Sequence, residues 1–216
     1  MEIQPRIVAI PPLGLEAELV VPAGARGIVL FAHGSGSSRL SPRNTRVAAA
    51  LQRAGLGTLL FDLLTQSEGE DRRLVFDVVL LAGRLVEATT WVRAQGAARA
   101  LPVGYFGAST GAAATLIAAA ERGNPVGAIV SRGGRPDLAG RSLARVRAPT
   151  LLIVGALDHE VLQLNRQALA ALGCEKQLAT VPGATHLFEE PGTLEVVIDL
   201  ACRWFTGHFS STIPSP

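Results

Sequence analysis

Residues 107–111, Gly-Ala-Ser-Thr-Gly, hold Ser109 midway between two glycines. An apolar run at 103–106 precedes this segment and an alanine-rich run at 112–122 follows it, as in a strand that turns sharply into a helix. Such a turn lifts the serine hydroxyl above the sheet, and the glycines leave room for the chain to double back. The helix N-terminus also favours the negative charge that develops during attack on a carbonyl. The pattern predicts a nucleophilic serine; the alternative is a small-residue turn with a solvated hydroxyl.

A serine hydroxyl is a weak nucleophile unless a base accepts its proton. His186 lies in a glycine-containing loop between the last predicted strand and the last predicted helix, a place that suits a general base. Asp158 comes shortly after the predicted strand at 150–155 and is placed to hold the imidazole in the required tautomer. We therefore expect Ser109, His186 and Asp158 to form a catalytic triad.

The remaining histidines and nearby acids fit these roles less well. His159 follows an acidic residue and is the alternative base, whereas His208, close to the C-terminus, is expected to serve packing or the surface. We expect His33 to shape its own loop rather than to act in catalysis. Glu160 and Asp137 are alternatives to Asp158.

Acyl transfer also requires hydrogen-bond donors for the tetrahedral oxyanion. We expect one donor to be the backbone N–H of Thr110, directly after the serine. Residues 33–38, His-Gly-Ser-Gly-Ser-Ser, are mostly small, so their backbone can approach a substrate closely. We expect the second donor to be the Ser35 N–H, with Gly36 as the alternative.

Short β-branched or leucine-rich runs alternate along the chain with longer segments of helical periodicity, which is typical of an α/β layer fold. The expected strands are residues 6–10, 15–21, 27–32, 57–62, 103–106, 126–130, 150–155 and 176–181. Turn residues at 11–14 predict an antiparallel hairpin of the first two strands. Continuous apolar runs from the third strand onward favour a parallel sheet covered on both faces, where ligands bind at the carboxyl ends of the strands.

Three helices can be placed from caps and apolar spacing. Ser41 and Pro42 suit the N-cap and the first position of a helix that reaches about Ala54. Apolar residues that recur at steps of three and four form a stripe, which predicts one long core-facing helix with Leu74, Val78, Leu81, Leu85, Ala88 and Val92. The last helix carries Leu194, Val197, Ile198, Ala201, Trp204 and Phe205.

These motifs resemble those of the α/β-hydrolase superfamily and, within it, of the dienelactone hydrolase-like family. The resemblance is carried by residues 31–38 (Phe-Ala-His-Gly-Ser-Gly-Ser-Ser), 60–65 (Leu-Phe-Asp-Leu-Leu-Thr), 104–111 (Gly-Tyr-Phe-Gly-Ala-Ser-Thr-Gly), 131–137 (Ser-Arg-Gly-Gly-Arg-Pro-Asp), Asp158 and 186–192 (His-Leu-Phe-Glu-Glu-Pro-Gly). They follow the serine–acid–histidine order of the superfamily. The resemblance implies a three-layer α/β-hydrolase sandwich with a mostly parallel central sheet of about eight strands and an N-terminal antiparallel hairpin.

Dienelactone hydrolases proper use a cysteine nucleophile, whereas position 109 is serine. The resemblance therefore implies a carboxylesterase for small acyl esters rather than a lactone hydrolase. About 19 residues, 131–149, connect the sixth and seventh predicted strands, so we expect no lid domain and an open site. A thioesterase, peptidase or acyltransferase would use the same machinery. A non-catalytic scaffold that binds small molecules is the alternative from another class.

Arg132 and Arg135 flank two glycines in that connection. Their guanidinium groups suit bidentate binding of a substrate carboxylate, so with Gly36 they are the candidate substrate-binding residues. The alternative is that they pair with Asp137 or face water. Asp62 and Thr65, at the end of the fourth strand, are expected to order a loop by local hydrogen bonds.

The composition excludes several functional classes. The 216 residues are 48% hydrophobic and 18% charged, which excludes a disordered chain and suits a single domain over residues 1–216. The net charge is +2 and basic residues are interleaved with acids, so we expect no nucleic-acid partner. The uncharged segment at 100–120 contains proline, glycine and too much alanine for a membrane span.

We expect no cofactor and no metal, because the sequence holds no His-Glu-x-x-His, Cys-x-x-Cys or phosphate-binding loop. Cys174 and Cys202 are expected to be free thiols. Residues 1–6 show no basic segment followed by an apolar stretch, so we expect no secretory signal and a cytoplasmic location. The expected partner is a small ester substrate, and the expected state is a monomer or a homodimer.

Overall fold

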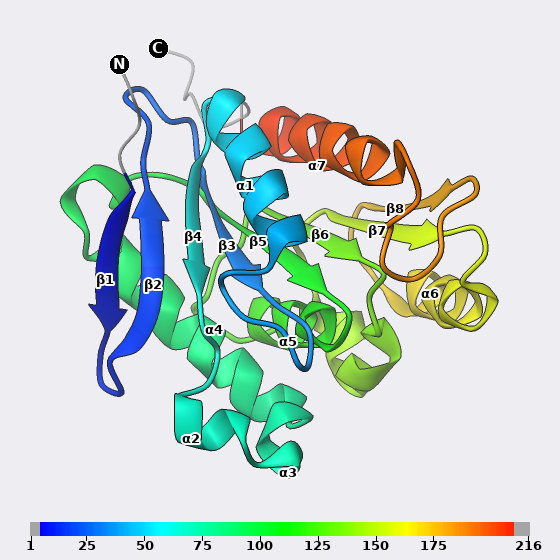
Figure 1. Cartoon of the computed structure of the whole chain (residues 1–216), viewed down its shortest axis with the longest axis horizontal. Coiled ribbons are helices and arrows are strands. Elements are labelled where there is room, and N and C mark those ends of the chain that lie inside the picture. The colour runs from blue at the N-terminus through cyan, green and yellow to red at the C-terminus, as the bar shows by residue number, and fades with distance from the viewer. Residues whose placement is uncertain (1–4, 210–216) are drawn as a thin grey trace.

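The computed structural model describes residues 5–209 and shows a central sheet with helices against both faces (Figure 1). Most of the segment for which no secretory signal is expected, residues 1–6, lies outside the described residues, so that expectation stays a prediction. Within residues 5–209, none of the helices combines the length and the apolar character that crossing a membrane would require.

Strands and helices alternate along most of the chain, as the sequence predicts. The strands are β1 (Arg6–Ile10), β2 (Leu15–Val20), β3 (Ile28–Ala32), β4 (Gly57–Phe61), β5 (Val103–Ala108), β6 (Ala128–Arg132), β7 (Thr150–Gly155) and β8 (Lys176–Val181). The α-helices are α1 (Pro42–Arg53), α2 (Gln66–Gly69), α3 (Arg72–Val75), α4 (Val78–Arg93), α5 (Thr110–Ala119), α6 (His159–Ala171) and α7 (Thr193–Phe209). Two 3-10 helices are η1 (Gly96–Ala98) and η2 (Pro136–Arg145).

The eight strands of the described chain form one sheet in the order β1-β2-β4-β3-β5-β6-β7-β8. β2 runs antiparallel to both of its neighbours, β1 and β4. Every pair from β4 across to β8 is parallel. The predicted fold is therefore confirmed: a mostly parallel sheet of eight strands with an N-terminal antiparallel hairpin.

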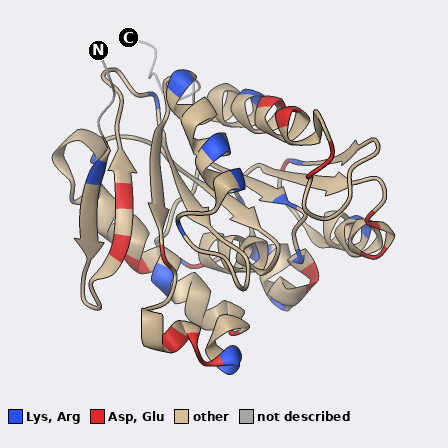
Figure 2. Ribbon diagram, viewed as in Figure 1, with Lys and Arg blue, Asp and Glu red and all other residues tan. Residues whose placement is uncertain are grey.

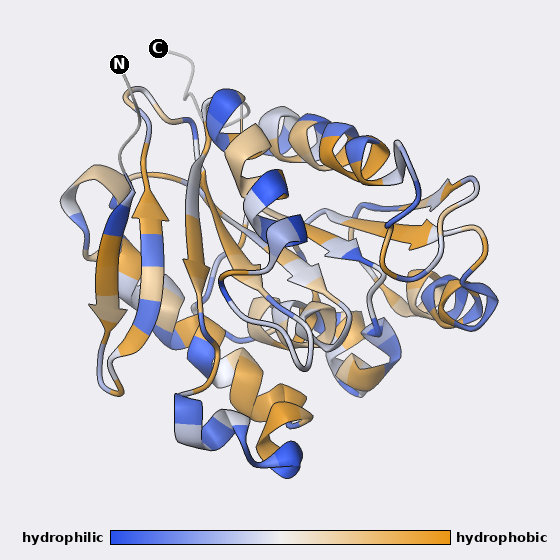
Figure 3. Cartoon of the chain, viewed as in Figure 1, coloured by the Kyte–Doolittle hydropathy of each residue, from blue (hydrophilic) through white to orange (hydrophobic). Residues whose placement is uncertain are grey.

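The five central strands, β3 to β7, are buried along their whole length, which is why their sequences are apolar on both faces. On one face, Leu51 of α1 and Phe205 of α7 pack in a cluster with Phe31 and Phe106. On the other face, α4 and α5 cover a second cluster that includes Tyr105. Figure 3 shows the strongest hydrophobic colours on the strands and alternating colours around the helices that cover them.

Charged residues are spread over several elements (Figure 2). α1 carries three arginines, and two of them, Arg43 and Arg46, pair with Glu189 and Glu195 from the α7 region. Two of the three positive charges of this helix are thus locally neutralised. This arrangement differs from the uninterrupted basic surface that phosphate backbones require.

Two predicted strand boundaries are wrong at the carboxyl edge of the sheet. β5 continues two residues beyond the expected end at 106, and β6 covers 128–132 instead of 126–130. The extra residues pair with one another, Gly107 with Ser131 and Ala108 with Arg132. Their small or polar types have low strand propensity, so only the pairing of the two strands extends them.

The single long helix predicted from the apolar stripe is also wrong. The structure breaks it into α3 and α4 at Phe76 and Asp77, although the stripe continues across the break. The Asp77 carboxylate accepts hydrogen bonds from the N–H groups of Val79 (3.1 Å) and Leu80 (2.9 Å), so it caps a new helix. Apolar spacing reports which face is buried, and it does not register such a cap.

The Asp77 cap predicts a measurable loss of stability on substitution. We expect Asp77→Ala to lower the free energy of unfolding by about 1 kcal/mol, because two helix N–H groups lose their acceptor. Asp77→Asn keeps an acceptor oxygen and should stay close to the wild type. Urea unfolding followed by circular dichroism measures both, and an Asp77→Ala protein as stable as Asp77→Asn contradicts the role of the cap.

Candidate active site

Ser109 occupies the turn between β5 and α5 with φ of 50° and ψ of −122°. This left-handed backbone conformation is rare for a residue with a side chain and must be held by its surroundings. The Ser109 N–H donates to Arg132 O at 3.3 Å, which ties the turn to β6. The Ser109 carbonyl accepts from the N–H groups of Ala112 (3.1 Å) and Arg135 (3.0 Å). The predicted sharp strand-to-helix turn is therefore present.

The two glycines that flank Ser109 are needed for close backbone approach. A Cβ on Gly111 would lie 2.2 Å from the carbonyl oxygen of Ala32, at the end of β3. A Cβ on Gly107 would lie 2.5 Å from Ala112 Cα. Both distances are far below van der Waals contact, so side chains here would push α5 away from the sheet.

Asp158 and His186 are in direct contact, although 28 residues separate them along the chain. Asp158 Oδ2 and His186 Nδ1 are 2.6 Å apart, with the Asp158 side chain 14% and the His186 side chain 38% exposed. Asp158 stands at the N-cap of α6, but its carboxylate makes no capping hydrogen bond and binds the imidazole instead. This bond places the proton on Nδ1 and leaves Nε2 as the basic nitrogen.

The loop that carries His186 packs against the loop after β7 without intervening side chains. A Cβ on Gly155 would lie 2.4 Å from Ala184 O, and the Leu157 N–H donates to the same oxygen at 3.0 Å. The sequence analysis did not single out Gly155. Its signal was available, because it is a glycine at the carboxyl end of a predicted strand, where the next loop must pass closely.

Ser109 bonds to Arg132, and His186 lies near the next residue, Gly133. Ser109 donates to Arg132 O, and a Cβ on Gly133 would lie 3.7 Å from His186 Cε1. Within residues 5–209, no hydrogen bond joins Ser109 Oγ to the imidazole. Catalytic hydrogen bonds are often long in a ligand-free site and shorten in the complex with substrate.

The two candidate oxyanion donors of the loop after β3 differ in their hydrogen bonds. The Ser35 N–H, expected as an oxyanion donor, donates to Thr110 Oγ1 at 3.0 Å, and the Ser37 N–H donates to Gly34 O at 3.2 Å. In the described chain the Gly36 N–H has no hydrogen bond. Of the two candidates, Gly36, the alternative donor, therefore has the unbonded amide, whereas the Ser35 amide must first leave Thr110.

His33 joins this loop to β4. Its Nδ1–H donates to Gly34 O at 3.0 Å, and Nε2 accepts the N–H of Leu63 at 3.2 Å. These two bonds require the neutral imidazole. Burial is the main cause that lowers the pKa of His33 below 6.5, so the ring stays neutral at neutral pH. These contacts agree with the expectation that His33 shapes its own loop.

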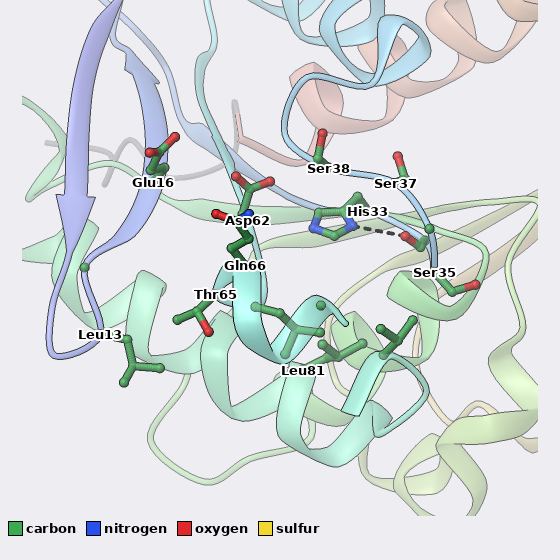
Figure 4. Close-up of a pocket in the computed structure, with 16 residues that line it drawn as sticks. Leu13, Glu16, His33, Ser35, Ser37, Ser38, Asp62, Thr65, Gln66 and Leu81 are labelled. Carbon is green, nitrogen blue, oxygen red and sulfur yellow. Dashed lines mark hydrogen bonds between the residues drawn. The ribbon is translucent and has the colours of Figure 1, made fainter. Parts of the chain in front are cut away.

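A cavity of about 500 Å³ opens beside the loop after β3 (Figure 4). Its wall includes His33 and Ser35 on one side and Thr65 and Leu81 on the other, with Leu13 from the hairpin turn. Ser109 and His186 are not among its lining residues. Gly34 joins the two regions, because it lines the cavity and a Cβ on it would lie 3.0 Å from Ser109 Cβ. The volume suits one small organic group.

The two candidate substrate arginines have different surroundings. Arg135 binds Asp137 in bidentate fashion, at 2.9 and 2.8 Å, as the alternative interpretation proposes. Arg132 is only 6% exposed and lies under the ring of Phe188, at 5.9 Å from its centroid. Neither guanidinium is presented to solvent as an open clamp.

The remaining expectations concern residues outside the turn. His159 is exposed at the start of α6, and His208 stacks on Trp204 with ring centroids 4.4 Å apart. Thr65 caps α2 by local hydrogen bonds, as predicted. The Asp62 bond is not local, since Asp62 Oδ1 accepts the N–H of Arg39, in the loop after β3, at 2.7 Å. The two cysteines are free, as predicted. No group of three or more potential metal ligands occurs within the described part of the chain.

The chain has close relatives among solved structures. A dienelactone hydrolase from Anabaena variabilis is 55% identical, matches 96% of this chain and 98% of its own length, and superimposes with a TM-score of 0.91. This chain belongs to the dienelactone hydrolase-like family of α/β-hydrolases. Carboxyl esterase 2 from Tuber melanosporum shares the fold at 17% identity, with a TM-score of 0.78 over 97% of this chain and 88% of its own. No family model matches the sequence.

Curated relatives place the same unit in a longer protein. A Mycobacterium tuberculosis protein, provisionally named a phosphoribosyl transferase, is 59% identical over 204 residues. The match covers 94% of this chain and 46% of that protein, so this dienelactone hydrolase-like chain spans about half the length of the relative.

The close approach at Gly111 predicts a severe effect of one methyl group. We expect Gly111→Ala to lower the free energy of unfolding by about 3 kcal/mol, because its Cβ meets backbone atoms that cannot move aside. Gly83→Ala is the matched control: it lies inside α4 with nothing within 4 Å of the added Cβ, and should raise stability by about 0.5–1 kcal/mol. Thermal and urea unfolding measure both variants. Equal stability of the two proteins contradicts the packing described.

The lowered pKa of His33 predicts a stability change with pH. The group binds its proton less readily in the folded chain than in the unfolded one, whose value is 6.5, so its contribution is full above that pH and declines as the pH falls. We expect unfolding free energy to drop between about pH 7.5 and about pH 5.5, and to drop less in His33→Gln, which carries no titrating ring. Urea unfolding at each pH provides the comparison, and the same pH slope in both proteins rules out this role.

Proposed function

We propose that this chain is a serine hydrolase that cleaves small carboxylic esters through an acyl-enzyme. The nucleophile is Ser109, the general base is His186 and the residue that orients the base is Asp158. Membership of a family of hydrolases supports the reaction class. The observation that carries the proposal is the 2.6 Å contact between Asp158 and His186, together with a serine held at φ of 50° in the predicted sharp turn.

The proposed reaction follows from these positions. Ser109 Oγ attacks the ester carbonyl while His186 Nε2 accepts the hydroxyl proton, and the Asp158 carboxylate stabilises the imidazolium. Collapse of the tetrahedral intermediate breaks the bond to the alcohol, which leaves with the proton from Nε2. Water then attacks the acyl-enzyme with the same base, which releases the acid and restores Ser109.

The proposed oxyanion donors are backbone amides at the N-terminus of α5 and in the loop after β3. We place the N–H of Thr110 first, since it directly follows the nucleophile. The N–H of Gly36 is the second donor, because it is unbonded, and the Ser35 N–H can replace it when it releases Thr110 Oγ1. Amides at these places stabilise the charge that develops on the carbonyl oxygen.

The size and lining of the cavity beside this loop support the proposal of a small substrate. Its apolar side chains, Leu13, Leu64, Val75 and Leu81, suit the hydrocarbon part of an acyl or alcohol group. Asp62 and Glu16 also line it, each paired with Arg39, and the described lining residues include no arginine or lysine that could bind an anionic group. We therefore propose a neutral ester of modest size as the substrate class.

Other activities remain alternatives within the same machinery. A thioesterase, peptidase or acyltransferase would use the same three residues, and a binding scaffold would use none of them. The phosphoribosyl transferase name belongs to a protein of which the matched segment is less than half. A cytoplasmic location, and a monomer or homodimer, stay part of the proposal.

Replacement of the serine tests the proposal directly. We expect Ser109→Ala to lower kcat for p-nitrophenyl acetate by about 10⁴- to 10⁶-fold while the melting temperature stays near that of the wild type, because alanine keeps the backbone and removes only the nucleophile. Ser67→Ala, an exposed serine in α2, is the matched control and should keep full turnover. A Ser109→Ala protein with wild-type turnover would falsify the proposal.

A fluorophosphonate probe separates an enzyme from a binding scaffold. Mass spectrometry should find the label on the peptide with Ser109 in the wild type and in Ser67→Ala, and no label on a protein that only binds. Comparing kcat/KM for an oxygen ester, a thioester and an anilide of the same acyl group then chooses among the catalytic alternatives. Preference for the anilide or the thioester would replace the esterase assignment.

A further inference from the structure

Arg132 is a buried cation without a carboxylate partner. It is the last residue of β6, its side chain reaches α1, and the residue is 6% exposed. The ion pairs of residues 5–209 do not include it. Nη2 donates to Asn44 Oδ1 at 3.4 Å, a long bond, and Nε is buried without a partner. The guanidinium therefore has little compensation for its lost hydration.

Other largely buried arginines of this chain are neutralised. Arg39 and Arg84, with side chains 16% and 14% exposed, each contact two carboxylates. Arg132 instead faces a second cation, Arg43, and burial together with this charge lowers its pKa to about 10. At neutral pH it still carries its charge. Replacement of such a cation by an apolar side chain of similar shape is often neutral or stabilising, so packing alone does not explain an arginine here.

The contacts of Arg132 reach both the turn that carries Ser109 and the loop that carries His186. Its carbonyl oxygen accepts the N–H of Ser109 at 3.3 Å. Its guanidinium carbon lies 5.9 Å from the ring centroid of Phe188, two residues after His186. One residue therefore contacts the nucleophile turn through its backbone and the histidine loop through its side chain.

Phe188 has an unusual backbone conformation within the histidine loop. The residue is 2% exposed and has φ of 56°, a left-handed conformation that is rare for an aromatic residue. The neighbouring Gly133 supports the same loop, since a Cβ there would lie 3.0 Å from His186 O and 3.4 Å from Phe188 Cε2. A cation against the ring face is attractive, and more so where water is excluded.

We propose that Arg132 is a positioning residue: its guanidinium holds the Phe188 ring, and through it keeps the imidazole of His186 over Ser109. The inference rests on the proposed function, since it assigns work to His186. It also explains why Arg132 is buried rather than offered to a substrate carboxylate. The buried cation lowers the free energy of unfolding, and its contact with Phe188 limits the motion of the histidine loop.

The test compares Arg132→Met, Arg132→Lys and Phe188→Leu with the double variant Arg132→Met/Phe188→Leu. We expect Arg132→Met to lower kcat for a small ester about 10- to 100-fold with KM almost unchanged, because a displaced base affects the chemical step. Its melting temperature should equal or exceed that of the wild type. Arg132→Lys keeps a cation and should recover part of kcat. Arg203→Met, on the exposed face of α7, is the control and should match the wild type.

A proton NMR measurement gives a readout independent of turnover. The Nδ1 proton of His186, shared with Asp158, should give a downfield signal in the wild type and in Arg132→Lys, and a broadened or lost signal in Arg132→Met. If the wild type neither hydrolyses esters nor reacts with a fluorophosphonate, the proposed function fails, while this signal still reports whether Arg132 orders His186.

Three results overturn the inference. The first is an Arg132→Met protein with the kcat and proton signal of the wild type. The second is a kcat loss in Arg132→Met that follows only its unfolded fraction, since that marks a purely structural residue. The third is additive effects of Arg132→Met and Phe188→Leu on kcat, because residues that act through one contact must be non-additive.

Discussion

Backbone-to-backbone contact at the carboxyl edge of the sheet is the constraint on which the proposed site depends. The turn at Ser109 touches the end of β3 at Gly111, and the loop after β8 touches the end of β7 at Gly155. Each contact is shorter than any side chain allows, so these two glycines set how closely the loops approach. The approach of the second pair brings the segments of Asp158 and His186 within hydrogen-bond reach.

Charge is distributed at this edge according to how much water each group keeps. Asp158 is shielded but accepts a hydrogen bond from His186, whereas His33 is buried and remains neutral with both ring nitrogens bonded. Arg132 is the exception, since it is buried and charged without a counter-ion in the described chain. Arg39 and Arg84, in the same fold, each pair with two carboxylates. Because Arg132 differs from them in this respect, we assign it a role in the site.

The comparisons and the geometry describe the same unit. The Anabaena dienelactone hydrolase aligns over nearly its whole length, and the M. tuberculosis relative contains the matched segment within a protein about twice as long. All the residues that we propose for the reaction lie within the described residues 5–209.

Much of the fold and the main site residues could be predicted from the sequence, because local patterns determine them. Apolar runs identify buried strands, and a serine between two glycines after such a run identifies a sharp turn. The pairing of Asp158 with His186 was inferred from the ends of two predicted strands, and the 2.6 Å contact agrees with it. Periodicity missed the break at Asp77, since a cap starts a new helix without interrupting the apolar stripe.

Tertiary structure alone decided the partners of groups that are distant in sequence. The Ser35 amide donates to Thr110 Oγ1 whereas the Gly36 amide is unbonded, and no local signal ranks these two neighbours. Arg132 and Arg135 look alike in the sequence, yet one pairs with a carboxylate two residues away and the other is buried against Phe188. The physical reason is that the sequence determines which side chains follow the end of each strand. Whether such a side chain is buried, and which group it bonds to, depends on the loops that the folded sheet places next to that strand end.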